Sequence, residues 1–238
     1  MSRPPKVMLD IGCGSGGVGY FVKQQHPECQ AWGAELDESA AVLARAHFDH
    51  VVVGDVETVD FQAAGLVAPF DLVCLLDVLE HLYNPWRLLE GLKRVISDDA
   101  HLIVSLPNVS NILLMYDALH GHWKYGRLGL LDWTHIRFFT DFDARKMFYQ
   151  TGYRVLSHTP SMFGQSGDIF AQYEQQSFPT NLSLGTKLNM RVDSREELAS
   201  LCAQQNIYLI TPHHGQDLSE KELALASNDY PTTYAFGL

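Results

Sequence analysis

The sequence has 238 residues, of which 46% are hydrophobic, which is enough for one domain with a substantial core. Seventeen basic against twenty-eight acidic residues give a net charge of -11, and the absence of any Lys/Arg cluster argues against nucleic acid as a partner. The four cysteines lack zinc-ligand spacing, and no apolar run approaches about 18 residues, so we expect a cytoplasmic protein without disulfides, bound metal or membrane insertion.

Short apolar runs alternate with amphipathic segments of helical period as far as about Ser157, a pattern typical of βαβ units around a parallel sheet. In chain order we predict strands at Lys6 to Ile11, Gln30 to Glu35, Val51 to Val53, Phe70 to Leu76, His101 to Leu106 and Tyr153 to Ser157. Helices are predicted at Gly17 to Gln25, Glu38 to His47, Pro85 to Ile96 and Asp141 to Gln150. Asn84 and Thr140 are the expected N-caps of the last two helices.

Two regions break this alternation. Ser110 to Ile136 is aromatic and glycine-rich, and we interpret it as a lid, because long insertions between the last strands lie above the strand carboxyl ends, where ligands bind. A plain surface loop is the alternative. The polar final third is predicted to contain a helix at Ser194 to Gln205 and a strand at Ile207 to Thr211 that closes the sheet edge. We therefore assign residues 1–214 to one domain, with the lid at about 110–136, and residues 215–238 to a C-terminal tail.

A glycine-rich stretch, Leu9-Asp10-Ile11-Gly12-Cys13-Gly14-Ser15-Gly16, joins the first predicted strand to the first helix. Its glycines allow a tight turn and close approach of a ligand to the backbone. Gly12, Gly14 and Gly17 also satisfy the GxGxxG spacing of dinucleotide-binding folds, so the glycines alone leave a nicotinamide enzyme open. Asp10 favours S-adenosylmethionine, because a carboxylate at the strand end repels a pyrophosphate and attracts ammonium and sulfonium charges. No Gly-Lys-Ser/Thr follows, which excludes a P-loop.

Carboxylates also follow the next two predicted strands. Glu35 ends the second strand, where an acidic residue can accept hydrogen bonds from both ribose hydroxyls of an adenosine cofactor, with ordinary surface charge as the alternative. Asp37 falls near a helix start, where a solvated anion suits the helix dipole. Asp55 could accept from the adenine amino group with Val56 against the ring, or could simply form a turn.

Taken in order, these residues resemble the successive motifs of class I S-adenosylmethionine-dependent methyltransferases. The resemblance extends from about Val7 to Gln150 and includes Gly33 to Asp37 and Leu76 to His81. It implies an α/β fold, a Rossmann-like, doubly wound, seven-stranded and mostly parallel sheet with helices on both faces. It also implies S-adenosylmethionine as methyl donor and S-adenosylhomocysteine as product. The cofactor-binding residues expected on this basis are Asp10, Gly12, Cys13, Gly14, Gly16, Glu35, Leu36, Asp55, Val56, Asp77 and Val78.

The segment Tyr125 to Thr140 further resembles a bacterial subgroup related to the ubiquinone and methionine-pathway methyltransferases. Members of that subgroup often accompany glycosyltransferases in surface-glycan pathways. The family usually has one or more helices before its first strand that help to cover the acceptor pocket, whereas here the strand begins almost at once. Either that cover is absent, or the C-terminal extension or a partner subunit, including a second copy in a homodimer, supplies it. The chain could equally be a fragment of a longer protein.

Two histidines are candidates for a general base, which an acceptor hydroxyl needs because its proton must leave as the carbon–oxygen bond forms. His81 follows the fourth strand, beside the expected methyl position, and Glu80 could either orient it or face solvent. His135 lies in the lid, with Asp132 and Arg137 as positioning groups. For each histidine, a hydrogen-bonded structural role is the alternative.

Asp77 is expected to serve the methionine end of the cofactor or the geometry of its loop. A metal-dependent version would use Asp77, Glu80, His81 and Asp132, since carboxylates and imidazoles suit divalent ions, but we expect a site without metal. The predicted function is O-methylation of a small hydroxylated acceptor, such as a sugar, a glycan precursor or a quinol. The alternatives are an N- or protein methyltransferase and a non-catalytic cofactor-binding partner subunit.

Overall fold

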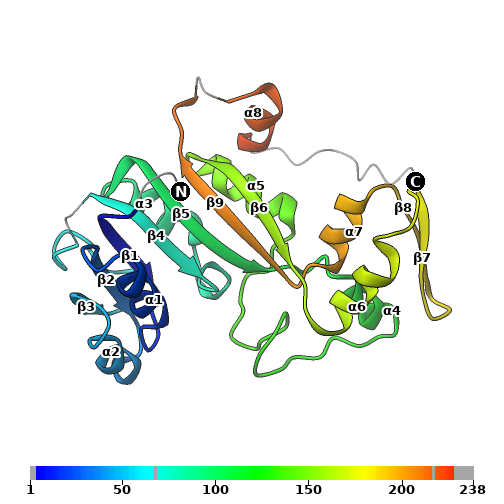
Figure 1. Ribbon diagram of the computed structural model, residues 1–238, viewed down its shortest axis with the longest axis horizontal. Helices are drawn as coiled ribbons and strands as arrows, with labels where there is room; N and C mark the ends of the chain where they lie inside the picture. The colour runs from blue at the N-terminus through cyan, green and yellow to red at the C-terminus, as the bar shows by residue number, and fades with distance from the viewer. Residues whose placement is uncertain (1–3, 67–68, 216–217, 228–238) are drawn as a thin grey trace.

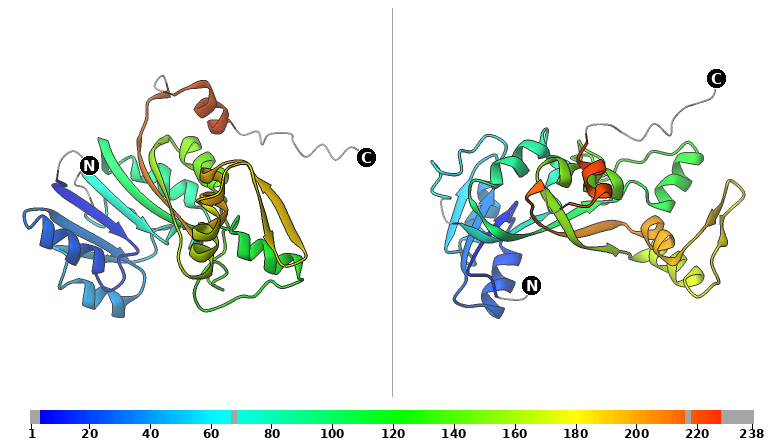
Figure 2. Two further views of the ribbon diagram at one scale, coloured as in Figure 1. Left: turned by 45° about the vertical axis from the view of Figure 1, so that its right-hand side comes forward. Right: turned by 90° about the horizontal axis from the view of Figure 1, so that it is seen from above.

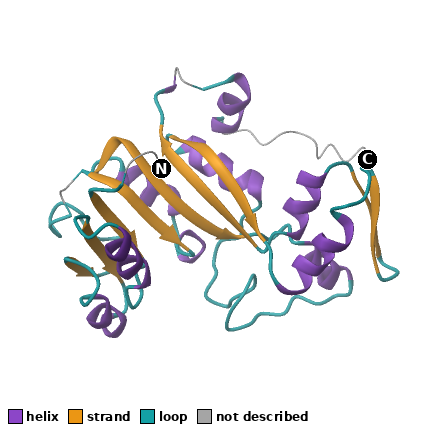
Figure 3. Cartoon of the chain, in the orientation of Figure 1, coloured by secondary structure: helices purple, strands orange, loops and turns teal. Residues whose placement is uncertain are grey.

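A seven-stranded sheet forms the centre of the molecule in the computed structural model, which describes residues 4–66, 69–215 and 218–227 (Figures 1 and 3). The strand order is β3-β2-β1-β4-β5-β9-β6. The strands are β1 (Val7–Ile11), β2 (Gln30–Glu35), β3 (His50–Val53), β4 (Phe70–Leu76), β5 (Ile96–Pro107), β6 (Tyr153–Ser161) and β9 (Gln205–Pro212). Neighbouring strands from β3 through β2, β1 and β4 to β5 are all parallel, whereas β9 runs antiparallel to both β5 and β6. The expected doubly wound, mostly parallel sheet is confirmed.

The predicted strand at Ile207 to Thr211 exists, but its expected position at the sheet edge is wrong. It belongs to β9, which lies between β5 and β6 and hydrogen-bonds to both of them. The edge on this side is formed by β6 instead. A strand that returns after β6 can occupy the space beside β5 because antiparallel pairing satisfies its backbone groups on both sides.

Helices cover both faces of the sheet. On one face, α1 (Gly17–Gln25) and α2 (Glu38–Ala44) pack over buried residues of β1, β2 and β4. On the other, α3 (Pro85–Leu92) and α5 (Asp141–Gln150) pack over β4, β5 and β9. The predicted N-caps are present, because the Asn84 and Thr140 side chains accept hydrogen bonds from backbone N–H groups in the first turns of α3 and α5.

Three predicted helix ends are wrong. The helix expected over Pro85 to Ile96 ends at Leu92, because Ile96 already pairs with Phe70 of β4 and begins β5. The second predicted helix ends at Ala44 rather than His47. In that turn the chain brings Phe48 into the core, where the residue is only 7% exposed. The helix expected over Ser194 to Gln205 ends at Cys202, because Gln205 already pairs with Pro107 in the sheet. All three helices therefore stop where tertiary contacts outweigh local propensity.

A second, smaller lobe stands beside the sheet, and we call it the cap (Figures 1 and 2). Most of it is inserted between β6 and β9, and α4 is contributed by the chain after β5. Its elements are α4 (Ile112–Leu119), α6 (Gly164–Tyr173), the hairpin of β7 (Thr180–Leu184) and β8 (Leu188–Val192), and α7 (Arg195–Cys202). The cap has its own core, which includes Ile112, Ile169, Leu182, Val192 and Leu198. The first part of the predicted lid is thus the helix α4, and the remainder runs as loop.

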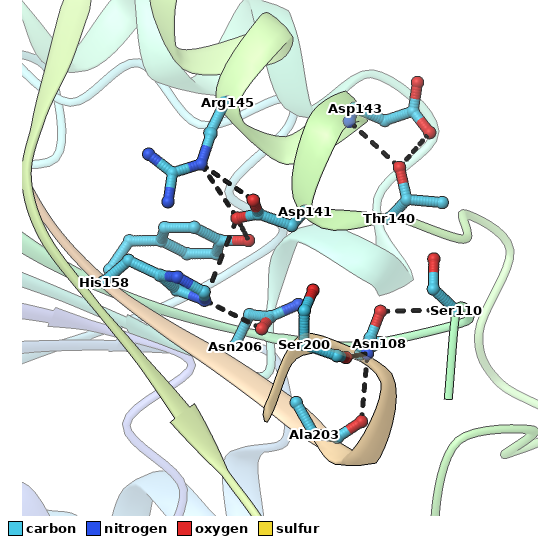
Figure 4. A network of polar contacts seen from close by, with 11 residues as sticks. Asn108, Ser110, Thr140, Asp141, Asp143, Arg145, His158, Ser200, Ala203 and Asn206 are labelled. Carbon is cyan, nitrogen blue, oxygen red and sulfur yellow. Dashed lines mark hydrogen bonds and ion pairs between the residues drawn. The ribbon is translucent and has the colours of Figure 1, made fainter. Parts of the chain in front are cut away.

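Two asparagines after β5 attach the cap to the sheet. The Asn108 amide donates to the carbonyls of Ser200 at 2.9 Å and Ala203 at 3.0 Å (Figure 4). The Asn111 amide donates to the Ala203 carbonyl at 2.9 Å and to Ser166 Oγ at 3.1 Å. Both asparagines are 1% exposed. Hydrogen bonds at such buried positions fix where the cap lies, because breaking them would leave buried polar groups unpaired.

The predicted tail contains a helix, α8 (Glu220–Ala226), that packs against α5. A capping box between Ser219 and Glu222 starts it, and Tyr149 of α5 donates a hydrogen bond to Glu222 at 2.9 Å. The rest of the predicted tail lies largely outside the described residues. Among the described helices, none combines the length and apolarity needed to cross a lipid bilayer.

Candidate active site

The glycine-rich stretch forms a tight loop between β1 and α1. Gly12, Gly14 and Gly16 have φ values of 70°, 52° and 97°, in the left-handed region that glycine adopts without strain. A Cβ atom added to Gly12 would lie 2.8 Å from Val78 Cγ2, whereas one added to Gly14 would meet nothing within 4 Å. The loop is therefore tightly packed at Gly12 and leaves open space at Gly14 for a ligand to approach the backbone.

Glu35, at the end of β2, holds this loop through its side chain. One carboxylate oxygen accepts from Gly14 N–H at 2.8 Å, and the other accepts from Leu36 and Asp37 N–H at 2.9 Å. Asp37 serves instead as the N-cap of α2, accepting from Ala40 N–H at 2.8 Å. Asp37 therefore lies at the helix start as predicted, whereas Glu35 bonds to backbone N–H groups and its expected role toward the ribose hydroxyls stays a prediction.

Asp10 lies beneath the loop and is only 2% exposed. Its Oδ2 has no hydrogen-bond partner among the described residues. Burial, with a smaller contribution from the negative charge of Glu35, raises the pKa of Asp10 to about 7. An unpaired, buried carboxyl group of this kind fits a cofactor that carries positive charge, because such a ligand favours the ionised form.

A pocket of about 230 Å³ opens at the carboxyl ends of β1, β2 and β4, and we call it the cofactor pocket. Predicted cofactor residues that line it are Gly12, Glu35, Leu36, Asp55, Val56, Asp77 and Val78. The remaining predicted residues, Asp10, Cys13, Gly14 and Gly16, belong to the loop or the strand end beside it. Asp55 also accepts from Glu57 N–H at 2.9 Å, so it shapes the turn after β3 as well. Carboxylates with apolar side chains between them suit an adenosine bearing a charged amino acid.

A second pocket, of about 240 Å³, adjoins the first and is called the acceptor pocket. Asp77 and His81 line both pockets, which places these two residues at the junction. The walls of the acceptor pocket come from the lid loop and from the two ends of the cap insertion. The other residues that line it are Glu80, Pro107, Leu128, Gly129, Leu130, Asp132, His135, Phe163, Gln204 and Gln205.

Asp77 holds the junction of the two pockets in a fixed geometry. Its φ of 56° is the only left-handed value among non-glycine residues in the described part of the chain. Its carboxylate accepts from Ser105 Oγ at 2.6 Å and from Gln205 Nε2 at 2.8 Å. The side chain therefore connects β4, β5 and β9, and the loop-geometry role expected for Asp77 agrees with these contacts.

The two candidate histidines come together although 53 residues separate them in the sequence. Their ring centroids are 4.8 Å apart in an edge-to-face arrangement. His81 Nδ1 lies 3.1 Å from the Thr134 carbonyl, and His135 Nδ1 lies 3.2 Å from the Leu130 carbonyl. Since a carbonyl only accepts, we assign the proton of each neutral ring to Nδ1, which leaves a lone pair on Nε2. Burial lowers the pKa of His135 and so favours this neutral form.

Glu80 lies directly beneath the lid loop and is 1% exposed. Its backbone carbonyl accepts from the N–H groups of Ile136 and Arg137, both at 2.9 Å, which docks the loop on the short 3-10 helix η1 (Leu79–His81). Neither side-chain oxygen of Glu80 has a hydrogen-bond partner among the described residues, and Oε1 lies 4.0 Å from His135 Nε2. Burial raises the pKa of Glu80 to about 8. Glu80 is thus oriented toward His135, whereas the sequence suggested a role beside His81.

The lid residues expected to position His135 make other hydrogen bonds. Asp132 Oδ1 accepts from the Thr134 backbone N–H at 2.8 Å and from its hydroxyl at 2.6 Å, and these bonds lower the pKa of Asp132. Arg137 Nε donates to the Tyr83 carbonyl at 3.2 Å. Asp132 remains in the wall of the acceptor pocket and Arg137 anchors the end of the lid, so His135 itself is held by the backbone of Leu130.

Ligand atoms of Glu80, His81 and His135 lie within 4.8 Å of one another, so these three residues could hold a metal ion. Asp77 and Asp132, which the sequence suggested for a metal-dependent version, are not in this group. Sequence reasoning also missed Phe163, Gln204 and Gln205, which line the acceptor pocket. The only available signal was that Gln205 precedes a predicted strand, and its direction in the sheet was unknown.

Comparison with known proteins agrees with this geometry. Residues 2–158 match the family described as a methyltransferase domain. Over 117 residues the chain is 26% identical to a ubiquinone biosynthesis O-methyltransferase from Glaesserella parasuis serovar 5 (strain SH0165), covering 43% of this chain and 46% of that protein. Over 128 residues it is 25% identical to an uncharacterized 37.1 kDa protein in transposon TN4556 of Streptomyces fradiae, covering 53% and 37%. These matches span less than half the length of either relative.

Solved structures share the fold at low identity. A possible histamine N-methyltransferase from Thermotoga maritima gives a TM-score of 0.57 at 14% identity, covering 89% of this chain and 84% of that one. The magnesium protoporphyrin IX methyltransferase from Synechocystis PCC 6803, solved with its bound cofactor product, gives 0.55 at 14% identity, covering 88% and 75%. The chain therefore belongs to the methyltransferase domain family, and its fold is that of solved S-adenosylmethionine-dependent methyltransferases.

Proposed function

We propose that this methyltransferase acts on a hydroxyl oxygen of a small acceptor, such as a sugar, a glycan precursor or a quinol. The observation that carries the proposal is the junction of the two pockets, where the imidazoles of His81 and His135 stand beside the acceptor pocket with Nε2 unprotonated. A volume of about 240 Å³ suits a small molecule better than a folded protein segment.

S-adenosylmethionine supplies an electrophilic methyl group bound to a sulfonium. The residues of the chain then have three tasks. The loop and Glu35 hold the adenosine end, Asp10 favours the positive charge, and the walls of the acceptor pocket hold the nucleophile in position. The hydroxyl proton must leave as oxygen bonds to carbon, and an unprotonated imidazole nitrogen at the junction can accept it. A neutral amine can attack the methyl group before it loses a proton, whereas a hydroxyl is a weak nucleophile unless a base removes its proton, so the two imidazoles favour oxygen over nitrogen.

The same proposal covers the binding partners and the cellular compartment of the enzyme. The cap belongs to this chain and supplies walls of the acceptor pocket, which supports a small-molecule acceptor without requiring a partner subunit. A homodimer or a partner subunit stays a prediction. All four cysteines are free and buried, which supports a reducing cytoplasm as the place where the enzyme works.

A labelled-methyl transfer assay tests the proposal. Purified enzyme is incubated with S-adenosylmethionine carrying a radioactive methyl group and a panel of sugars, nucleotide sugars and quinols, with amines as the comparison panel. We expect label on hydroxylated acceptors. His81→Ala and His135→Ala should each lower turnover by about 100-fold or more while S-adenosylhomocysteine binding stays within a few fold, as measured by calorimetry.

The exposed lid histidine provides a matched control, because His122→Gln changes an imidazole outside both pockets and should leave turnover unchanged. Transfer to amines alone would contradict O-methylation. Cofactor binding without transfer to any panel member would instead support the non-catalytic alternative. Full activity in both alanine variants would show that neither imidazole takes part in the reaction.

A further inference from the structure

The Glu80 side chain is a buried carboxyl group that makes no hydrogen bond to any described residue. It is 1% exposed, and both of its oxygens lack hydrogen bonds within the described part of the chain. Burying a carboxylate without a partner is unfavourable, so such groups in folded proteins are usually paired or coordinate a metal. If the histidines act only as general bases, the burial of the Glu80 carboxyl group has no explanation. Its position therefore indicates a ligand that residues 4–66, 69–215 and 218–227 do not supply.

The surroundings of Glu80 indicate what that ligand is. We propose that Glu80, His81 and His135 bind a divalent transition-metal ion at the junction of the cofactor and acceptor pockets. Their ligand atoms lie within 4.8 Å of one another, and the Glu80 and His135 atoms are 4.0 Å apart. Metal–ligand bonds of about 2.0 to 2.2 Å at tetrahedral angles place donor atoms about 3.3 to 3.6 Å apart, so side-chain movements of about 1 Å bring the three donors to binding distance.

The second coordination shell is already in place. Each imidazole presents Nε2 because its Nδ1–H is bound to a backbone carbonyl, Thr134 for His81 and Leu130 for His135. Metal-binding histidines in proteins typically show this arrangement, which fixes the tautomer and the ring orientation. The Glu80 backbone is likewise fixed, since its carbonyl holds the lid through two hydrogen bonds. Two of the three donors lie on η1, and the third lies on the lid loop. Backbone hydrogen bonds hold all three residues in place.

The donor set also selects the class of metal. Two imidazoles and one carboxylate suit Zn²⁺, Fe²⁺ or Mn²⁺ better than Mg²⁺ or Ca²⁺, which prefer oxygen ligands alone. Three protein ligands leave coordination positions open, and all three residues line the acceptor pocket. Asp132 also lines this pocket, but its carboxylate is engaged by Thr134. We therefore expect the open positions to be filled by water or by acceptor oxygen.

With a metal bound, the two imidazoles act as metal ligands and not as a general base. The catalytic part of this inference rests on the proposed O-methylation. A metal-bound hydroxyl loses its proton near neutral pH, and the proton passes to water at the mouth of the pocket. The oxygen then forms a bond to the methyl carbon while the carbon–sulfur bond breaks, and its electron pair remains on sulfur in S-adenosylhomocysteine. The histidines act as metal ligands in this scheme, and no side chain has to accept the proton.

Direct binding tests the site without any acceptor. Full-length protein is stripped with a chelator and titrated with Zn²⁺, Mn²⁺ or Co²⁺ in a calorimeter, and Co²⁺ is also followed by visible absorption, which reports nitrogen ligation. We expect one ion per chain and a rise in melting temperature on metal addition. Glu80→Gln and His135→Gln should weaken binding by about 100-fold and abolish that rise, whereas His122→Gln should bind like the wild type.

Folding of the variants is checked separately, because Glu80→Gln keeps the side-chain shape and removes the buried charge. A metal-free Glu80→Gln protein with an unchanged circular dichroism spectrum shows that lost binding is not lost structure. Absence of stoichiometric binding to the wild type, or equal binding by all variants, would overturn the proposal. Hydroxyl methylation that survives complete metal removal would also overturn the catalytic role while leaving O-methylation intact, whereas metal binding without hydroxyl methylation would contradict the proposed function alone.

Discussion

Replacing Asp10 with Asn separates the stability of the protein from its affinity for the cofactor. Burial raises the pKa of Asp10 from 3.8 to about 7, so the native state binds this proton more tightly than the unfolded chain does. Stability from this group is therefore fully present below pH 4 and is lost as pH rises through 7. Each pKa unit corresponds to about 1.4 kcal/mol, so the shift amounts to about 4 kcal/mol at neutral pH and above.

The variant lacks this titration. Relative to the wild type, Asp10→Asn should gain roughly 3 kcal/mol in the free energy of unfolding between pH 5 and pH 8. Urea denaturation of the cofactor-free proteins at several pH values measures the difference, and other titrating groups cancel in the comparison. Asp37→Asn is the matched control. Hydrogen bonds from Ser39 and Ala40 lower the pKa of Asp37, so the stability difference between that variant and the wild type should change only below about pH 4 and should stay constant between pH 5 and pH 8.

Cofactor binding should change in the opposite sense. A ligand with ammonium and sulfonium groups favours ionised Asp10, so binding near pH 7 should release about half a proton from the wild type. Calorimetry with S-adenosylmethionine in buffers of different ionisation enthalpy measures that release. In Asp10→Asn we expect no proton release from this site and about tenfold weaker binding, which corresponds to about 1.4 kcal/mol. A stability difference that does not vary with pH, together with unchanged affinity, would show that the Asp10 reasoning is wrong.

Three further substitutions test the loop and the cap. Gly12→Ala would place a Cβ 2.8 Å from Val78 at a φ of 70°, so calorimetry should show S-adenosylhomocysteine affinity at least about tenfold lower. Asn111→Leu removes the donor to Ser166 Oγ and to the Cys202 carbonyl, while the Ala203 carbonyl keeps its bond from Asn108, and the free energy of unfolding in urea should fall by about 1 to 3 kcal/mol per group at most. Leu198→Ala removes a fully buried side chain from the cap core and should cost about 2 to 5 kcal/mol, with faster hydrogen exchange confined to the cap if that lobe opens independently.

Local patterns in the sequence were sufficient for much of the sheet and its helices. β2, β4, α1 and α5 have the predicted bounds, because apolar periodicity and N-caps such as Thr140 act over a few residues. The glycine loop could also be predicted from the sequence, since left-handed φ values favour glycine whatever the tertiary surroundings of the loop are. Carboxylates at the ends of successive parallel strands had to converge, and Glu35 and Asp55 line one pocket as the strand order requires.

Long-range packing decided the rest. The position of β9 depends on pairing with β5 and β6, and no local pattern records which strands are neighbours. The cap joins α4 with an insertion that begins about 40 residues later, because separate amphipathic elements bury one shared core. His81, His135 and Glu80 were each predicted from the sequence as separate candidate site residues. Only the tertiary structure brought the two rings to 4.8 Å, buried the Glu80 carboxyl group where no described residue hydrogen-bonds to it, and turned Asp132 toward Thr134, because contact and burial arise from distant segments folding together.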